Sequence, residues 1–146
     1  MNLTTRRLIA FWTMLLSLHL VAEVPTEETV IVLFEADIAE GAVSEVSELV
    51  ERMSALNELD ELETLVYRAF ISEDGKRVTF METYSNTEAM LFHDKRFTRH
   101  FANDPFRLTT NNRFATYGAV SEQHKSFATA NGFIVEYGDL VSGFSR

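Results

Sequence analysis

The sequence contains no cysteine, and this absence excludes several kinds of chemistry. Without a thiol the chain can form no disulfide, no thiolate nucleophile, and no zinc or iron–sulfur site built on cysteine ligands. The sequence also lacks a Gly-x-Ser-x-Gly motif and a glycine-rich loop after an expected strand. Neither nucleophilic serine catalysis nor binding of a dinucleotide is therefore predicted.

Basic residues are scarce relative to acidic ones. Lys and Arg together number 13, against 22 Asp and Glu, and the formal net charge is −9. Residues 1–22 hold two of the arginines and no acid, so the remaining chain carries a charge of −11. Because such a surface repels a polyanion on average, we expect no nucleic-acid partner.

The first 22 residues differ in character from the rest. Arg6 and Arg7 precede a mostly apolar run from Leu8 to Ala22, and acidic residues begin at Glu23. This layout is typical of a signal peptide, although the run is short for a transmembrane helix of about 20 residues. The alternative is an N-terminal helix that packs on the domain or on a partner. The first interpretation predicts export to the periplasm, or membrane attachment if the segment acts as an anchor, and the second predicts a cytoplasmic protein.

The rest of the sequence alternates between strand-like and helix-like patterns. Apolar, β-branched and aromatic runs of strand length predict strands, and apolar residues repeating every three to four positions predict helices. The pair Asp74-Gly75, which tolerates positive φ, predicts the turn of a hairpin. In order, the expected elements are a strand at Thr29–Ile38, a helix at Glu40–Leu59, the hairpin at Thr64–Ser85, a helix at Asn86–Phe101 and a strand at Arg113–Val120.

The C-terminal part predicts a further helix and strand. Ser121–Asn131 is a helix candidate that Gly132 would close, and Phe133–Tyr137 has the length of a short strand. The whole order is β-α-β-β-α-β with an α-β extension, which is the ferredoxin-like α+β pattern with an antiparallel sheet. We expect an N-terminal segment at 1–28, one domain at 29–120, and an extension packed on it at 121–146.

The arrangement also predicts a dimer. Both helices of a ferredoxin-like fold cover the same face of the sheet and leave the other face bare. If that face is apolar, the pairing of two sheets in a homodimer would cover it.

The run VTFMETYSNTEAMLFHDKRFTRHF, residues 78–101, carries a family resemblance. It resembles the dimeric α+β barrel proteins of the antibiotic-biosynthesis monooxygenase type, in which a strand ends in Glu-x-aromatic, here Glu82-Thr83-Tyr84. A helix start follows, here at residues 86–89, and then a histidine, here His93, while Tyr67 matches a tyrosine frequent in the preceding strand. The resemblance covers residues 29–120 and implies a homodimer with a pocket for a small aromatic or apolar ligand.

The same resemblance implies three kinds of function. Relatives include oxygenases of phenols and quinols that need no cofactor, haem-degrading enzymes, and proteins with no known reaction. The haem-degrading branch uses an Asn–Trp–His set, whereas strand 29–38 has no Asn and Tyr84 stands where the family often has Trp. We therefore expect no cofactor and keep haem binding or degradation as an alternative.

The histidines of the second helix do not predict a metal site. Projected at 100° per residue, His93 and His100 lie on one edge of the apolar stripe that contains Met90 and Phe97. They are about 10.5 Å apart along the helix axis, too far to share one metal ion with bonds near 2 Å. The sequence has no HExxH motif either. Phe97 and His100 are kept as candidate ligand-binding residues, with His100 nearer the surface and His124 nearer still.

His93 is the candidate catalytic residue. An imidazole at the edge of an aromatic cavity can take a proton from a phenol, because its ordinary pKa is near 6.5. The alternative is a histidine at the edge of the core, bonded to Glu82 or to a backbone carbonyl. Glu82 is expected to orient His93 or to pair with Arg68, and Tyr67 and Tyr84 to line the pocket. The charged run 57–63 is most simply a solvated helix end and is given no function.

The prediction is thus a homodimer that binds a small aromatic or apolar ligand, with His93 as the general base of a cofactor-independent monooxygenase. One alternative is a non-catalytic ligand-binding or stress-related protein with the same fold. The other is haem binding or degradation through His93.

Overall fold

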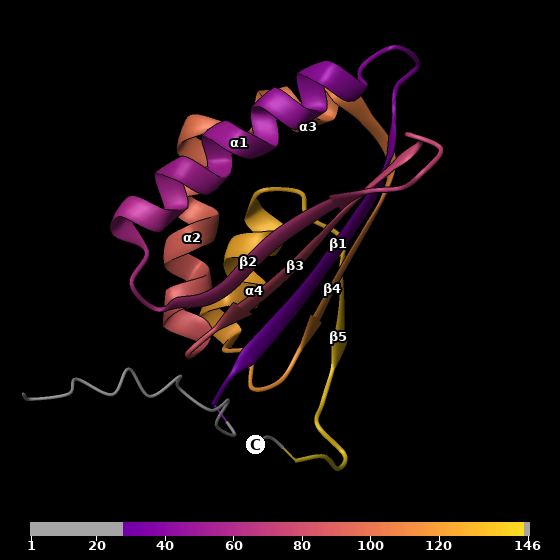
Figure 1. Ribbon diagram of the computed structural model, residues 1–146. Coiled ribbons are helices and arrows are strands. Elements are labelled where there is room, and N and C mark those ends of the chain that lie inside the picture. Colours follow the sequence, from indigo (N-terminus) through magenta and orange to yellow (C-terminus); the bar gives the residue numbers. More distant parts are fainter. Residues whose placement is uncertain (1–27, 145–146) are drawn as a thin grey trace, which may run out of the picture.

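The computed structural model describes residues 28–144, and the expectations for the first 22 residues lie outside this range. The described chain forms five strands and four helices (Figure 1). They follow the predicted order, with one additional short helix before the fourth strand. These are β1 (Val30–Ile38), α1 (Val43–Asp60), β2 (Thr64–Ile71), β3 (Arg77–Tyr84), α2 (Thr87–His100), α3 (Asn103–Leu108), β4 (Thr109–Tyr117), α4 (Glu122–Ala130) and β5 (Val135–Gly138).

The strands form one sheet in the order β2-β3-β1-β4-β5. The first four strands pair antiparallel, and β5 joins the edge of β4 in parallel. Helices α1, α2 and α4 lie on the same side of this sheet (Figure 1). The predicted ferredoxin-like α+β fold with a C-terminal α-β extension is confirmed, and the extension turns the antiparallel sheet into a mixed one.

The side chains of β1 and β3 alternate between the two faces of the sheet. On β1 and β3 the residues that face the helices are buried or nearly so, and cross-strand pairs such as Val32–Glu82 and Phe34–Phe80 fix the register. Val46, Leu49 and Met53 of α1 pack against this face. The period of two on the strands and the apolar stripe on the helix together make the core.

Several boundaries differ from the sequence-based expectation. Strand β4 begins at Thr109, four residues before the predicted start, because the polar run at its beginning still pairs with β1. Asn111 adopts a φ of 50° there, and its amide donates to Asp37 Oδ2 at 2.9 Å. Pro105 lies in the first turn of α3, where a helix needs no backbone N–H donor.

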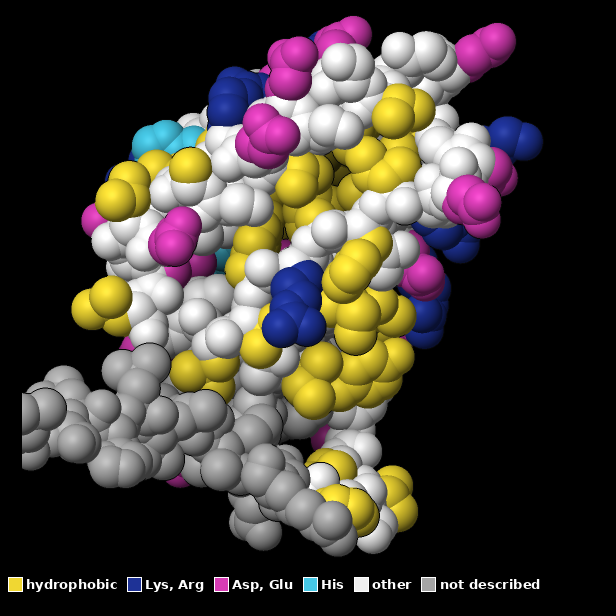
Figure 2. Space-filling model, viewed as in Figure 1, with side chains coloured by type: hydrophobic (Ala, Val, Ile, Leu, Met, Phe, Trp, Pro, Cys, Tyr) yellow, Lys and Arg dark blue, Asp and Glu magenta, His cyan; other side chains and the backbone are white. Residues whose placement is uncertain are grey.

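The other face of the sheet carries exposed apolar side chains. Ile31, Phe70, Met81 and Tyr117 all point away from the helices, and each is at least 40% exposed. Figure 2 shows hydrophobic side chains gathered over the strands on this face. We call these four residues the open-face patch.

None of the helices within residues 28–144 is both long enough and apolar enough to cross a membrane.

Candidate functional site

A cavity of about 250 Å³ lies between the helix-facing side of the sheet and helices α1, α2 and α3. Figure 2 shows a hollow lined by hydrophobic side chains between α1 and β2. Apolar and aromatic side chains form most of the wall, and five polar residues interrupt it: Glu82, His93, Asp94, Thr109 and Asn112. The apolar and aromatic lining residues are Val32, Phe34, Val46, Leu49, Val50, Met53, Val78, Phe80, Phe97, Pro105, Phe106, Phe114, Phe133 and Ile134.

His93 on α2 is buried and reaches this cavity. Its Nδ1 lies 2.8 Å from Oε2 of Glu61, and the rings of Tyr67 and Tyr84 flank its imidazole at centroid distances of 5.8 and 5.4 Å. With Nδ1 engaged by a carboxylate, Nε2 has no hydrogen-bond partner among residues 28–144. The geometry therefore fixes the ring and leaves one nitrogen for a ligand.

Glu61 holds His93 because of how α1 ends. The chain leaves the helix at Glu61, whose N–H donates to Asn57 O at 2.9 Å, and the side chain turns inward. Its carboxylate also accepts from Thr64 Oγ1 at 3.0 Å and contacts Arg96 Nε at 3.3 Å. Burial by itself raises the pKa of Glu61, but the bonds to His93 and Thr64 and the charge of Arg96 lower it overall.

The charges around His93 favour its protonated form. Burial lowers the pKa of an imidazole, but the hydrogen bond to Glu61 and the negative charges of Glu82, Glu61 and Asp94 outweigh this and raise the pKa of His93 to about 9. At neutral pH the ring is therefore mostly a cation facing the cavity.

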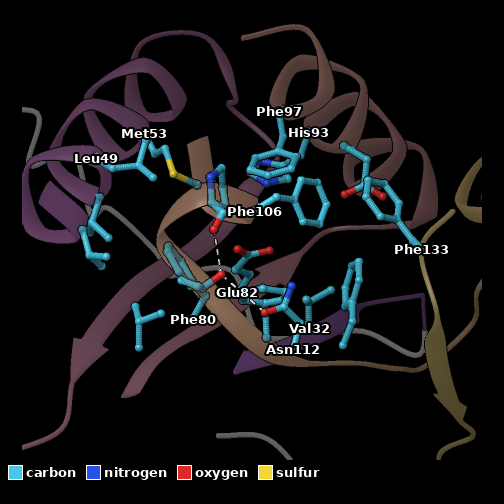
Figure 3. Close-up of a pocket in the computed structure, with 18 of the residues that line it drawn as sticks. Val32, Leu49, Met53, Phe80, Glu82, His93, Phe97, Phe106, Asn112 and Phe133 are labelled. Atoms are coloured by element: carbon cyan, nitrogen blue, oxygen red, sulfur yellow. Dashed lines mark hydrogen bonds between the residues drawn. The ribbon is translucent and has the colours of Figure 1, made fainter. Parts of the chain in front are cut away.

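Glu82 points into the same cavity from β3 (Figure 3). Its Oε2 accepts from the hydroxyl of Tyr84 at 2.6 Å, and burial raises the pKa of its carboxyl. The predicted pairing of Glu82 with Arg68 is wrong, because Arg68 stands opposite Met81 on the open face. The expected bond from Glu82 to His93 is not formed either, since Glu61 takes that place.

The remaining predicted site residues fall into two groups. Phe97 lines the cavity, as His93 does, whereas the rings of Tyr67 and Tyr84 contact His93 but are not part of the cavity wall. Burial, together with the charges of Glu82 and Glu61, raises the pKa of the Tyr67 hydroxyl well above its ordinary value. His100 is exposed at the end of α2 and does not line the cavity.

A second histidine is buried at the same end of the cavity. His124 on α4 is fully buried, and its Nε2 lies 2.7 Å from Oδ2 of Asp94. The expectation that His124 lies near the surface is therefore wrong. It fails because α4 packs against α2 and covers the face of α4 that carries His124 and Ala128.

Sequence reasoning missed Glu61 and Asp94, although the helical repeat contained a signal for each. Leu49, Met53 and Asn57 are buried at intervals of four, and Glu61 continues that row. Asp94 likewise follows the fully buried Met90 by four positions. A charged residue in such a row must be buried, and a buried charge requires a partner.

The residues of the cavity do not fit haem. The two groups beside His93 in the wall are acids, and no Lys or Arg of residues 28–144 lines the cavity to bind the haem propionates. Nor does the described part of the chain contain a group of three or more His, Asp and Glu placed to hold a metal ion.

No protein-family model matches the sequence, and no curated protein matches it either. Solved structures do share the fold. MupZ from Pseudomonas fluorescens is 18% identical, with a TM-score of 0.69 over 82% of this chain and 95% of that chain. SnoaB from Streptomyces nogalater, a cofactor-independent oxygenase solved as a point mutant, is 14% identical, with a TM-score of 0.54 over 64% of this chain and 95% of that chain.

A proposed antibiotic biosynthesis monooxygenase from Deinococcus radiodurans is 16% identical, with a TM-score of 0.55 over 63% of this chain and 93% of that chain. The chain thus has the α+β fold of the antibiotic-biosynthesis monooxygenase type, which confirms the fold that the resemblance implied.

Proposed function

We propose that the protein binds a small aromatic molecule in the cavity and oxygenates it with molecular oxygen, without a cofactor, using His93 as general base. The observation that carries the proposal is that an aromatic-lined cavity reaches a histidine whose Nδ1 is held by Glu61. The fold is also that of SnoaB, a cofactor-independent oxygenase. A space of about 250 Å³ suits a ligand smaller than a typical drug molecule, for which pockets start near 300 Å³.

The proposed reaction begins with the loss of a proton from the substrate. Neutral His93 accepts the proton of a phenolic hydroxyl at Nε2, while Glu61 stabilises the resulting imidazolium. The electron-rich anion then reacts with oxygen directly. For an anthrone, His93 takes the proton from the CH₂ group or from the hydroxyl of the enol form. The CH₂ carbon then becomes a carbonyl, one oxygen atom enters the product, and the other leaves as water together with the two hydrogens of the CH₂ group.

The pKa of His93 sets the pH dependence of this reaction. Because that pKa is about 9, only a small fraction of His93 is neutral at pH 7. The proposed rate therefore rises with pH and levels off above about 9. A phenol with an ordinary pKa near 10 loses its proton to such a base at a cost of roughly 1.4 kcal/mol.

Oxygen uptake with a panel of hydroquinones and anthrones tests the proposal. Purified protein should accelerate uptake for at least one member of the panel, and His93→Gln should abolish the acceleration. His100→Gln is the matched control, since this exposed histidine of the same helix does not line the cavity. Equal uptake with the wild type and with His93→Gln would contradict the assignment of His93.

One observation favours a second candidate, a non-catalytic or stress-related binding protein. The charges of Glu61 and Glu82 help to raise the pKa of Tyr67, and the same charges oppose ionisation of a bound phenol. A phenol would then be bound and released unchanged. Saturable binding of 1-naphthol without any oxygen uptake across the panel supports this candidate over the first.

The proposed active form is a homodimer joined through the open-face patch. Ile31, Phe70, Met81 and Tyr117 together form an exposed apolar surface on the sheet, and large exposed apolar patches mark interaction sites. A second copy of the same sheet carries the same apolar surface, so the two patches can cover each other in an isologous interface.

A further inference from the structure

The pair formed by Asp94 and His124 joins the C-terminal extension to the cavity. Asp94 is 7% exposed and lines the cavity next to His93, while His124 supports it from α4. The ring of Tyr137 on β5 packs against His124 edge-on, with centroids 6.5 Å apart. The extension thus fixes the position of a carboxylate that faces the ligand space.

This pair leaves polar atoms without partners. Oδ2 of Asp94 is taken by His124, but Oδ1 makes no hydrogen bond to any residue of 28–144. Within the same range, Nδ1 of His124 is buried without a partner. Because Asp94 lines the cavity, its unpartnered Oδ1 is available to a ligand there, whereas Oδ2 is already held by His124.

The extension contributes to the cavity in a second way. Gly132, Phe133 and Ile134, between α4 and β5, form part of its wall. Figure 3 shows Phe133 at the edge of this cavity. The same extension therefore supplies both an apolar wall for the ligand and the support for a charged group.

We propose that Asp94, positioned by His124, is a second ligand-binding group that accepts a hydrogen bond from a hydroxyl or N–H of the ligand. The inference rests on the proposed function, in which His93 binds one hydroxyl of an aromatic ligand. The ligand then carries two polar groups, one at Nε2 of His93 and the other, a hydrogen-bond donor, at Oδ1 of Asp94.

The chemistry of Asp94 determines which ligand group it binds. A carboxylate only accepts hydrogen bonds, so it selects a donor and disfavours an ether or a second carboxylate. A site that hydrogen-bonds a hydroxyl strongly disfavours an analogue without that hydroxyl, because the protein group is then left without a partner.

Calorimetric titration without oxygen tests the inference. The probes are the dihydroxynaphthalene isomers, each compared with its monomethyl ethers, and 1-naphthol. For at least one isomer, the wild type should bind the diol ten- to a hundred-fold more tightly than the ether. In Asp94→Asn this ratio should fall towards one, while the affinity for 1-naphthol stays within about threefold.

His124→Gln tests the positioning role separately. It should lower the ratio of diol to ether affinity while leaving 1-naphthol binding intact, which a purely structural role would not do. Asp104→Asn, a carboxylate outside the cavity wall, is the control and should keep the wild-type ratio.

The outcomes separate the two proposals. If 1-naphthol binds in a His93-dependent way but every diol and ether bind equally, the inference about Asp94 is wrong and the proposed function stands. A ratio that is unchanged in Asp94→Asn also overturns the inference. If no naphthol binds to the wild type, both proposals fail. The wild-type comparison needs no variant and stays decisive even if Asp94→Asn does not fold.

Discussion

Protonation of His93 contributes to the free energy of unfolding, and the size of this contribution depends on pH. Its pKa is about 9 in the folded protein against an ordinary value of 6.5. The contribution is therefore complete below about pH 6.5 and disappears as the pH rises through 9. It amounts to roughly 3 kcal/mol.

Urea unfolding at pH 6 and pH 9.5 measures this effect. The free energy of unfolding of the wild type should fall between these pH values by about 3 kcal/mol more than that of His93→Gln. If the free energy of unfolding has the same pH dependence in both proteins, the pKa of His93 is not raised in the folded protein.

Two buried glutamates next to the cavity should respond differently to loss of charge. Glu61 has a lowered pKa and pairs with His93, so Glu61→Gln leaves a buried imidazole without its counter-charge and should cost about 3 kcal/mol. Glu82 has a raised pKa and accepts a hydrogen bond from the hydroxyl of Tyr84, so Glu82→Gln should cost less than about 1 kcal/mol, because the amide oxygen of glutamine can accept the same bond. Chemical unfolding at pH 7 compares the two variants, and equal losses of free energy would contradict the pairing of Glu61 with His93.

At the scale of single residues the sequence predicts the centre of the site but not its partners. His93 and Phe97 follow from helical spacing, and both line the cavity. Glu61 lies in a run of charges that resembles a solvated helix end, and only the turn after α1 brings it inward. His124 is separated from Asp94 by 30 residues, so no local pattern predicts their contact.

At the scale of elements, Gly118 allows the chain after β4 to pass close to the backbone just before β1. Gly118 has a φ of 112°, and a Cβ there would lie 2.4 Å from the carbonyl oxygen of Thr29. Gly118→Ala should therefore destabilise the protein by several kcal/mol, through both the backbone strain and the clash.

Gly41 provides the matched comparison for this prediction. It also has a positive φ, of 77°, but a Cβ there would meet no atom within 4 Å. Gly41→Ala should cost only about 1 kcal/mol. Thermal unfolding of the two variants measures the difference, and similar melting temperatures would contradict the role of the close approach to Thr29.

The elements themselves were largely predictable because local signals specify them. Gly75 adopts a φ of 70° at the predicted hairpin turn, and Asn86 caps α2 by accepting from the N–H of Ala89 at 2.9 Å. The start of β4 was not predictable, since Thr109 to Asn112 have little strand character. The strand begins at Thr109 because the end of β1 still provides partners, Ile38 for Thr109 and Asp37 for Thr110.

At the scale of the whole molecule, the open-face patch predicts the oligomeric state. The wild type should sediment as a species with twice the mass of one chain, because a dimer covers the exposed Phe70 and Met81. Met81→Glu should yield monomers, since it places a charge in the middle of the apolar interface.

Leu62→Glu is the control for this prediction. Leu62 is 89% exposed, but it lies in the turn between α1 and β2 and not on the open face. Sedimentation equilibrium should show an unchanged dimer for this variant. A monomeric wild type, or a Met81→Glu variant that dimerises as strongly as the wild type, would contradict the proposed interface.

The most direct measurement of the central claim is the ¹⁵N NMR spectrum of the histidine side chains, assigned with His93→Gln. In the free protein His93 should titrate with a midpoint near pH 9. Addition of 1-naphthol without oxygen should shift the Nε2 resonance of His93 to saturation, while Nδ1 keeps the signature of its hydrogen bond to Glu61. If 1-naphthol leaves both resonances of His93 unchanged, the ligand does not bind at His93 and the proposed site is wrong.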